Sequence, residues 1–246
     1  MMTEMKTGMI TQSTSQTPNT SLQGLTGATK VEKINSLIGG AGTIINYLPQ
    51  YYNLIAKIDG HDPSLTIAIT AHHDTVHPEY ENCLDNTASV LNLTKIYRQL
   101  VRNKPRHNII CAWVDAEEAC NLDIAGVTHL VKHNQIEYVI DLELTASGTI
   151  PLVKKYGLFN YGSGNFWNNL ISKNMPYNNA YAASLSGVIR GSACLTIVSE
   201  KDLNDLDHMH FCDRWRQCHS ITDTFDTWYS ESESGTFINN LISGLL

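Results

Sequence analysis

Three expected strands that have histidine or carboxylate side chains at or near their ends constrain the fold of this chain more than any other feature. The first, the apolar run Leu65–Ala71, is followed at once by His72, and the second, Ile109–Val114, is followed by the pair Glu117-Glu118. A third expected strand, Tyr138–Leu144, carries the carboxylates Asp141 and Glu143 near its end. Continuous apolar runs of this length are typical of parallel strands that are covered on both faces. The sequence therefore predicts a buried sheet with polar groups at its carboxyl edge.

Segments with helical spacing lie between these runs. After Asp85, which can cap a helix, apolar residues recur at Val90, Leu93, Tyr97 and Val101. Further helices are expected at 31–37, from 120 to 131 and at 237–246, and further strands at 51–58 and 193–198. Strands that alternate with helices predict an α/β fold, with a three-layer α/β/α arrangement around a mostly parallel central sheet.

The length of 246 residues suits one sizeable domain, which we expect over residues 30–246. Residues 1–29 are rich in Ser, Thr and Gln and poor in large apolar groups, so we expect them to form a disordered tail. They contain no apolar stretch of signal-peptide length, and no later run reaches the roughly 18 residues that a membrane span needs. A cytoplasmic location is therefore predicted.

The charge balance bears on the partners of the chain. The formal net charge is −7, and no basic patch or basic helix is visible. Nucleic acid and anionic membrane surfaces are therefore not expected as partners. The six cysteines are scattered in a way that does not resemble a small disulfide scaffold.

The polar groups at the strand ends have the chemistry of metal ligands. In an α/β sheet, ligands bind at the carboxyl ends of the strands, so we expect these side chains to converge. Two adjacent carboxylates at Glu117 and Glu118 would repel each other unless a cation or a proton compensates them. His72 offers an imidazole, and Asp74, on the same face of an extended segment, could orient that ring. The alternatives are a strand-end histidine with a structural role, a helix cap at Asp85 and a solvated acidic loop.

Five short words carry a resemblance to a known family. They are A-H-H-D-T-V (71–76), C-L-D-N-T-A-S (83–89), V-D-A-E-E-A (114–119), I-D-L-E-L (140–144) and C-H-S-I-T-D-T-F-D-T (218–227). Together they resemble the di-zinc aminopeptidases of metallopeptidase family twenty-eight, a group that also contains the glutaminyl cyclases. The resemblance implies a zinc-peptidase-like fold and two Zn²⁺ ions per chain.

The resemblance also implies a ligand set. His72, Asp85 and Glu143 would hold one zinc ion, and Asp85 would bridge to the second ion. Glu118 and His219 would complete the shell of that second ion. The notable departure is Glu143, because the family has Asp at the matching place in N-L-D-M.

By the resemblance, Glu117 is the general base. Asp74, which could orient the ring of His72, is the second predicted catalytic residue. Asp141, two residues before Glu143, is a second candidate for its ligand role. The histidines of H-M-H at 208–210 could also form a ligand pair, although a surface loop is the expected reading. The stretch 182–193 departs from the family pattern that shapes the substrate pocket.

The function implied is a zinc-dependent hydrolase, an aminopeptidase that removes N-terminal residues from peptides. Three alternatives stay open. They are a glutaminyl cyclase-like acyltransferase with one zinc ion, a carboxypeptidase or amide deacylase with the same metal core, and a catalytically inactive homologue that binds a partner.

Overall fold

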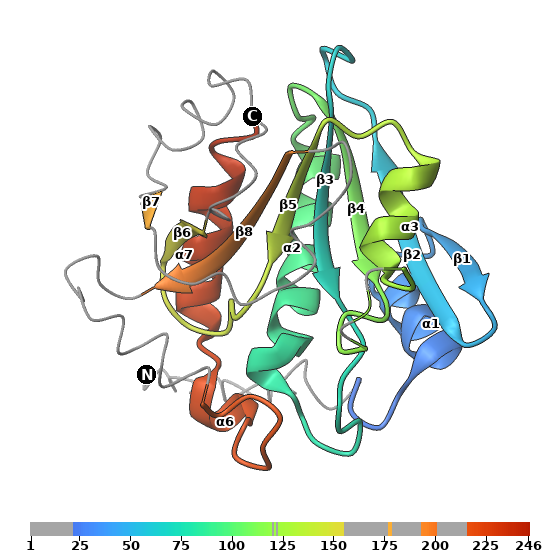
Figure 1. Ribbon diagram of the computed structural model, residues 1–246. Helices are drawn as coiled ribbons and strands as arrows, with labels where there is room; N and C mark the ends of the chain where they lie inside the picture. Colours follow the sequence, from blue (N-terminus) through green and yellow to red (C-terminus); the bar gives the residue numbers. More distant parts are fainter. Residues whose placement is uncertain (1–21, 120, 122, 155–176, 179–192, 201–215) are drawn as a thin grey trace, which may run out of the picture.

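The computed structural model describes residues 22–119, 121, 123–154, 177–178, 193–200 and 216–246, and its ribbon is drawn in Figure 1. In chain order the elements are α1 (Gly27–Leu37), β1 (Thr43–Leu48), β2 (Tyr51–Ile58), β3 (Thr66–His72), the π-helical turn η2 (Cys83–Thr87), α2 (Ala88–Arg102), β4 (Asn108–Val114), α3 (Gly126–His133), β5 (Tyr138–Leu142), β6 (Ile150–Lys154), β7 (Tyr177–Asn178), β8 (Ala193–Glu200), α6 (Phe225–Trp228) and α7 (Glu231–Ile242). Among the described residues, none of the helices combines the length and apolarity needed to cross a lipid bilayer.

The strands form one mixed sheet in the order β1-β2-β4-β3-β5-β8-β6-β7. The pairs β3–β4, β3–β5, β5–β8 and β6–β7 are parallel, whereas β1–β2, β2–β4 and β6–β8 are antiparallel. The α/β class is therefore confirmed, but the sheet is mixed, and the prediction that it is mostly parallel is not confirmed. One reason is the connection between β1 and β2, which is too short for a crossover and permits only an antiparallel pair.

Alternating side chains of the central strands enter two separate apolar clusters. In β4, Ile109, Cys111 and Trp113 face the cluster that contains α1, α2 and α7, whereas Ile110 and Ala112 face the cluster that contains α3. Strand β3 divides in the same way. The central strands are therefore buried on both sides, as their continuous apolar runs predict. The three-layer arrangement as a whole stays a prediction.

The path of the chain explains why α2 and α3 lie on opposite faces. From β3 the chain runs through α2 to its neighbour β4, and from β4 it runs through α3 past β3 to β5. Parallel crossovers are almost always right-handed, so two crossovers in opposite directions place their helices on opposite faces. Figure 1 shows α3 in front of the sheet and α2 behind it. The connections therefore diverge at the carboxyl end of β3, where such sheets bind ligands.

Several predicted boundaries need correction. Helix α3 begins at Gly126 and not at Cys120, and α7 runs from Glu231 to Ile242 where 237–246 was predicted. The interpretation of Asp85 as a helix cap is wrong, because the N-cap of α2 is Thr87 and the backbone of Asp85 is not helical. A residue that precedes an amphipathic run need not begin the helix when other contacts hold its backbone.

Residues 22–29, which were predicted to be part of the disordered tail, belong to the described part of the structure. Leu22 is 2% exposed and belongs to the same core cluster as α1 and α2, and α1 begins at Gly27. The Ser- and Thr-rich composition of the preceding residues concealed this one large apolar side chain. Residues 1–21 lie outside the described residues.

Leu22→Ala should therefore destabilise the protein by about 2–5 kcal/mol, because the substitution removes buried methyl groups and leaves a cavity. Urea denaturation at equilibrium measures this change, with Glu32→Ala, at an exposed position of α1, as the control. Equal unfolding midpoints for the two variants would show that residue 22 contributes nothing to the core.

Candidate metal centre

The carboxyl ends of three neighbouring parallel strands supply the first part of the site. Strand β3 lies between β4 and β5, and His72 is its last residue. Glu117 and Glu118 follow β4, and Glu143 follows the last residue of β5. Because the carboxyl ends of parallel strands meet at one edge of the sheet, the polar residues that end the apolar runs come together there.

Asp85 reaches this edge from the turn η2, which other segments hold in place. The Leu84 N–H donates to Asp223 Oδ1 at 2.7 Å, and the Asp85 N–H donates to Asp223 Oδ2 at 3.4 Å. The Asn86 side-chain amide donates to Leu142 O, at the end of β5, at 2.9 Å. The peptide bond between Asp85 and Asn86 is cis. Contacts from the sheet and from the carboxyl-terminal part of the chain therefore hold the backbone around Asp85.

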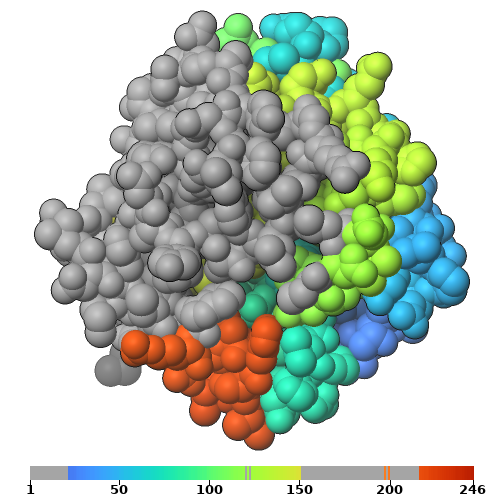
Figure 2. Space-filling model, viewed as in Figure 1, coloured from blue at the N-terminus to red at the C-terminus, as the bar shows by residue number. Residues whose placement is uncertain are grey.

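The segment that carries His219 lies directly against this turn. Figure 2 shows the orange segment around residues 216–230 beside the teal segment near residue 80, at the lower edge of the molecule. The Phe225 N–H donates to Glu81 Oε2 at 2.7 Å, which joins the two segments a second time. His219 itself has a positive φ of 59°, a backbone conformation that few residues other than glycine adopt readily.

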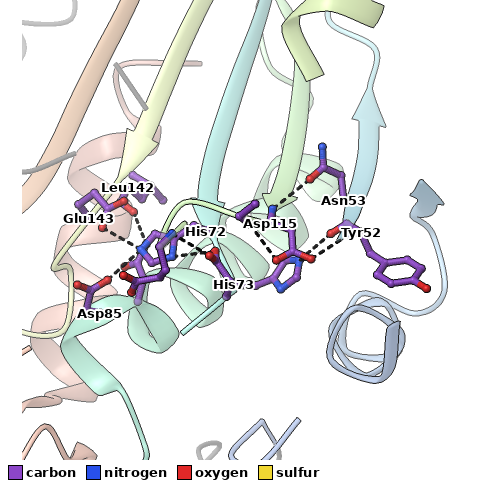
Figure 3. A network of polar contacts seen from close by, with 12 residues as sticks. Tyr52, Asn53, His72, His73, Asp85, Asp115, Leu142 and Glu143 are labelled. Atoms are coloured by element: carbon purple, nitrogen blue, oxygen red, sulfur yellow. Dashed lines mark hydrogen bonds and ion pairs between the residues drawn. The ribbon is translucent and has the colours of Figure 1, made fainter. Parts of the chain in front are cut away.

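Two imidazoles flank the carboxylate of Asp85. His72 Nε2 lies 2.9 Å from Asp85 Oδ1 and 3.5 Å from Glu143 Oε2. His219 Nε2 lies 3.2 Å from Asp85 Oδ2 and 3.2 Å from Glu118 Oε1. Each imidazole nitrogen thus faces two carboxylates, and Asp85 contributes one oxygen to each group. Figure 3 shows the first of these groups.

The protonation of these side chains reflects a strong excess of buried negative charge. Burial and the neighbouring Asp85 raise the pKa of Glu118 to about 7, and burial holds the pKa of Glu143 well above its usual value. Burial opposes charge on His72 as well, but Glu143 and the other carboxylates around the ring raise its pKa. The carboxylates therefore need positive charge beside them, from imidazolium groups or from a cation.

The residues present fit a metal ion. Ligand atoms of His72, Asp85 and Glu118 all lie within 4.8 Å of one another. Glu143 Oε1 is buried and has no hydrogen-bond partner among the described residues. A set of imidazole nitrogens and carboxylate oxygens in this arrangement suits Zn²⁺.

The two predicted catalytic residues lie beside this group. Asp74 Oδ1 lies 3.3 Å from His72 Nδ1, and Asp74 Oδ2 accepts the Glu118 N–H at 2.8 Å. Glu117 is half-buried; burial raises its pKa, the nearby His72 lowers it, and Asp85 raises it again. Asp74 can therefore orient the His72 ring and the backbone of Glu118 together.

Asp141, the alternative ligand, has a different environment. Its Oδ1 accepts the Thr70 hydroxyl from the neighbouring strand at 2.6 Å. Strand β5 ends at Leu142, so Glu143 extends beyond the strand, and its carboxylate approaches His72. The longer side chain of glutamate therefore reaches the imidazole from this position.

Some sequence-based hypotheses fall outside the described residues, and some important side chains were not singled out in the sequence. The H-M-H residues at 208–210 and most of the stretch 182–193 belong to the first group. Asp223 and Asp115 belong to the second. Each lies inside a word quoted for the resemblance. Tyr52 and Leu84, whose N–H groups donate to Asp115 and Asp223, are distant from them in sequence, so only the acidic character of the two residues was available as a signal.

Comparisons with known proteins extend these observations. The family model described as peptidase family M28 matches residues 53–234. No curated protein matches the sequence significantly. Among solved structures, the LapA aminopeptidase of Legionella pneumophila is similar with a TM-score of 0.66 at 16% identity, over 92% of this chain and 67% of that chain.

Two further solved structures resemble the chain in fold. BSAP, a zinc aminopeptidase of Bacillus subtilis, has a TM-score of 0.56 at 14% identity, over 78% of this chain and 48% of that chain. The glutaminyl cyclase of Tannerella forsythia has a TM-score of 0.62 at 15% identity, over 91% of this chain and 92% of that chain. At these identities the likeness shows a shared fold.

Glu143→Ala should lower the zinc content of the purified protein, because it removes a carboxylate from the His72 group. Asp141→Ala is the matched control, since it removes a buried carboxylate two residues away whose oxygen is held by Thr70. Metal analysis after dialysis against a weak chelator measures both. The opposite ranking of the two variants would transfer the ligand role to Asp141.

Proposed function

The chain belongs to peptidase family M28, and from this premise we propose that it is an aminopeptidase with two co-catalytic zinc ions. The observation that carries the proposal is the carboxylate of Asp85, whose two oxygens face the imidazoles of His72 and His219 separately. A single carboxylate in this position suits a bridge between two cations.

The five predicted ligands divide into two sets around this bridge. His72, Asp85 and Glu143 would hold one ion, and Asp85, Glu118 and His219 would hold the other. The contacts of 2.9–3.5 Å among these side chains support the division. Two zinc ions would supply Lewis-acid activation of a water molecule and of the scissile carbonyl.

The protein side chains perform the proton transfers in this proposal. Glu117 accepts a proton from the attacking water and returns it to the amine that leaves. Its half-buried position among carboxylates raises its pKa toward the range that suits a general base. Asp74 Oδ1, 3.3 Å from Nδ1, would orient the ring of His72, whose Nε2 faces Asp85 and Glu143.

The proposed substrate is a short peptide with a free amino terminus. The carboxylates around the site would attract its ammonium group, and the N-terminal peptide bond would then lie near Glu117. This assignment also draws on the fold that the chain shares with the aminopeptidases of Legionella pneumophila and Bacillus subtilis.

A glutaminyl cyclase is the second candidate. The observation that favours it is length, because the chain covers 92% of the Tannerella forsythia glutaminyl cyclase but 48% of the Bacillus subtilis zinc aminopeptidase. A cyclase needs one zinc ion, and its attacking amine belongs to the substrate. We prefer the aminopeptidase because the proposed ligands of the second ion lie together. His219 Nε2 is 3.2 Å from Asp85 Oδ2 and 3.2 Å from Glu118 Oε1.

Glu117→Gln should lower kcat by about 10²–10⁴-fold, because the amide cannot accept the proton. Zinc content should stay unchanged, since Glu117 is not among the proposed ligands. Steady-state kinetics and metal analysis on the same preparation measure the two quantities, with Glu32→Gln on the exposed face of α1 as the control. Loss of zinc from Glu117→Gln would instead assign residue 117 as a ligand.

Zinc-loaded wild-type protein should bind about two ions per chain and release N-terminal residues from unblocked peptides, but not from acetylated ones. Mass spectrometry of the products identifies the reaction. One bound ion together with pyroglutamate formation from an N-terminal Gln peptide would favour the cyclase. Preference for blocked amino termini would favour a carboxypeptidase or deacylase, and zinc binding without turnover of any of these peptides would favour an inactive binding homologue.

A further inference from the structure

A second polar network lies beside the metal centre and has no part in holding an ion. Figure 3 shows it on the side of His73 away from Asp85, with Tyr52, Asn53 and Asp115. These residues come from β2 and from the loops that follow β3 and β4. The network therefore joins the edge of the sheet to the segment that carries Glu117 and Glu118.

Asp115 is the centre of this network. Its Oδ2 accepts the Tyr52 N–H at 2.9 Å, and its Oδ1 accepts the Ala116 N–H at 2.9 Å. Its own N–H donates to Asn53 Oδ1 at 3.1 Å. Each carboxylate oxygen thus accepts from a different backbone N–H, one on the neighbouring strand and one on the next residue. An asparagine side chain would present an NH₂ group to one of these two donors.

The hydrogen bond to Ala116 supports a strained backbone. Ala116 has a φ of +62°, in the left-handed region where a Cβ atom is unfavourable. A residue persists in this conformation only when its surroundings hold it there. The turn at Ala116 leads directly into Glu117 and Glu118, and Glu118 Oε1 then lies 3.2 Å from His219.

Gly126 supports Asp115 from the opposite side. Its N–H donates to Asp115 O at 2.7 Å, and its O accepts from the Asn53 amide at 2.8 Å. A Cβ atom at position 126 would lie 2.2 Å from Asn53 Oδ1 and 2.6 Å from Asp115 N. The close packing at this point therefore requires glycine and leaves the Asp115 backbone little room to move.

His73 completes the surroundings of the Asp115 carboxylate. Its Nε2 lies 2.8 Å from Tyr52 O, and because a carbonyl oxygen only accepts, this nitrogen must donate. The same nitrogen lies 4.0 Å from Asp115 Oδ2. His73 thus packs between β2 and Asp115, while its neighbour His72 faces the metal centre.

We propose that Asp115 is a positioning residue that fixes the Ala116 turn and so sets the placement of Glu117 and Glu118. The inference rests on the proposed function, in which Glu117 is the base and Glu118 a ligand. Asp115 acts through the backbone and does not touch substrate or metal.

The test compares Asp115→Asn with Asn108→Ala in the full-length, zinc-loaded protein. Asn108 lies at the other end of the same strand, where its Oδ1 accepts the Gly60 N–H at 3.0 Å, so its loss removes a backbone contact far from the site. Asp115→Asn should weaken one of the two bound zinc ions about 10–100-fold in chelator competition. It should also lower kcat about 10–100-fold with a smaller change in KM. Asn108→Ala should change only the melting temperature.

The outcomes separate this inference from the proposed function. If Asp115→Asn matches Asn108→Ala in zinc affinity and kcat, the positioning role is overturned while the proposed function stands. If wild-type protein binds zinc but lacks peptidase activity, the proposed reaction is overturned. The positioning role of Asp115 is then judged by whether Asp115→Asn binds zinc more weakly than Asn108→Ala. Wild-type protein that binds no zinc overturns both. If Asp115→Asn does not fold, Asn53→Ala, which removes the acceptor of the Asp115 N–H and keeps the Asp115 carboxylate, should produce the same losses; wild-type values for that variant would contradict the inference.

Discussion

The carboxylate of Asp85, placed between two imidazoles, is the interaction on which the rest of the site depends. One oxygen lies 2.9 Å from His72 and the other 3.2 Å from His219, so this side chain joins the sheet to the carboxyl-terminal segment. A buried anion is costly unless positive charge and hydrogen bonds compensate it. The backbone around Asp85 is accordingly held by Asp223 and, through Asn86, by the end of β5. The folded chain thus places the Asp85 carboxylate beside two imidazole groups, which can carry positive charge.

Much of the central sheet could be predicted, because strands that are buried on both faces appear in the sequence as continuous apolar runs. Strand β2 has the predicted bounds, and β4 ends at Val114 as expected. These apolar runs do not reveal the direction of a strand, which depends on how the chain turns between strands. The exposed and half-buried edge strand β1 was therefore not predicted, and neither was its antiparallel pairing with β2.

The candidate site divides in a similar way. His72, Glu118 and Glu143 follow apolar runs, so their meeting at one edge could be predicted from the topology of parallel strands. The roles of Asp115 and Asp223 could not, because each also accepts from a backbone N–H that is distant in the chain, at Tyr52 and at Leu84 respectively. The error at Asp85 has the same origin, since a contact from Asp223 holds its backbone out of the helix that follows.

The order of the site residues along the chain has a consequence for synthesis. His219 and Asp223 are the last to leave the ribosome, and until then the turn around Asp85 lacks both its second imidazole and the carboxylate that holds its backbone. A nascent chain that has already formed β3, β4 and β5 would therefore present an incomplete centre. In a metallopeptidase, this order would delay activity until residues 219–223 have been made.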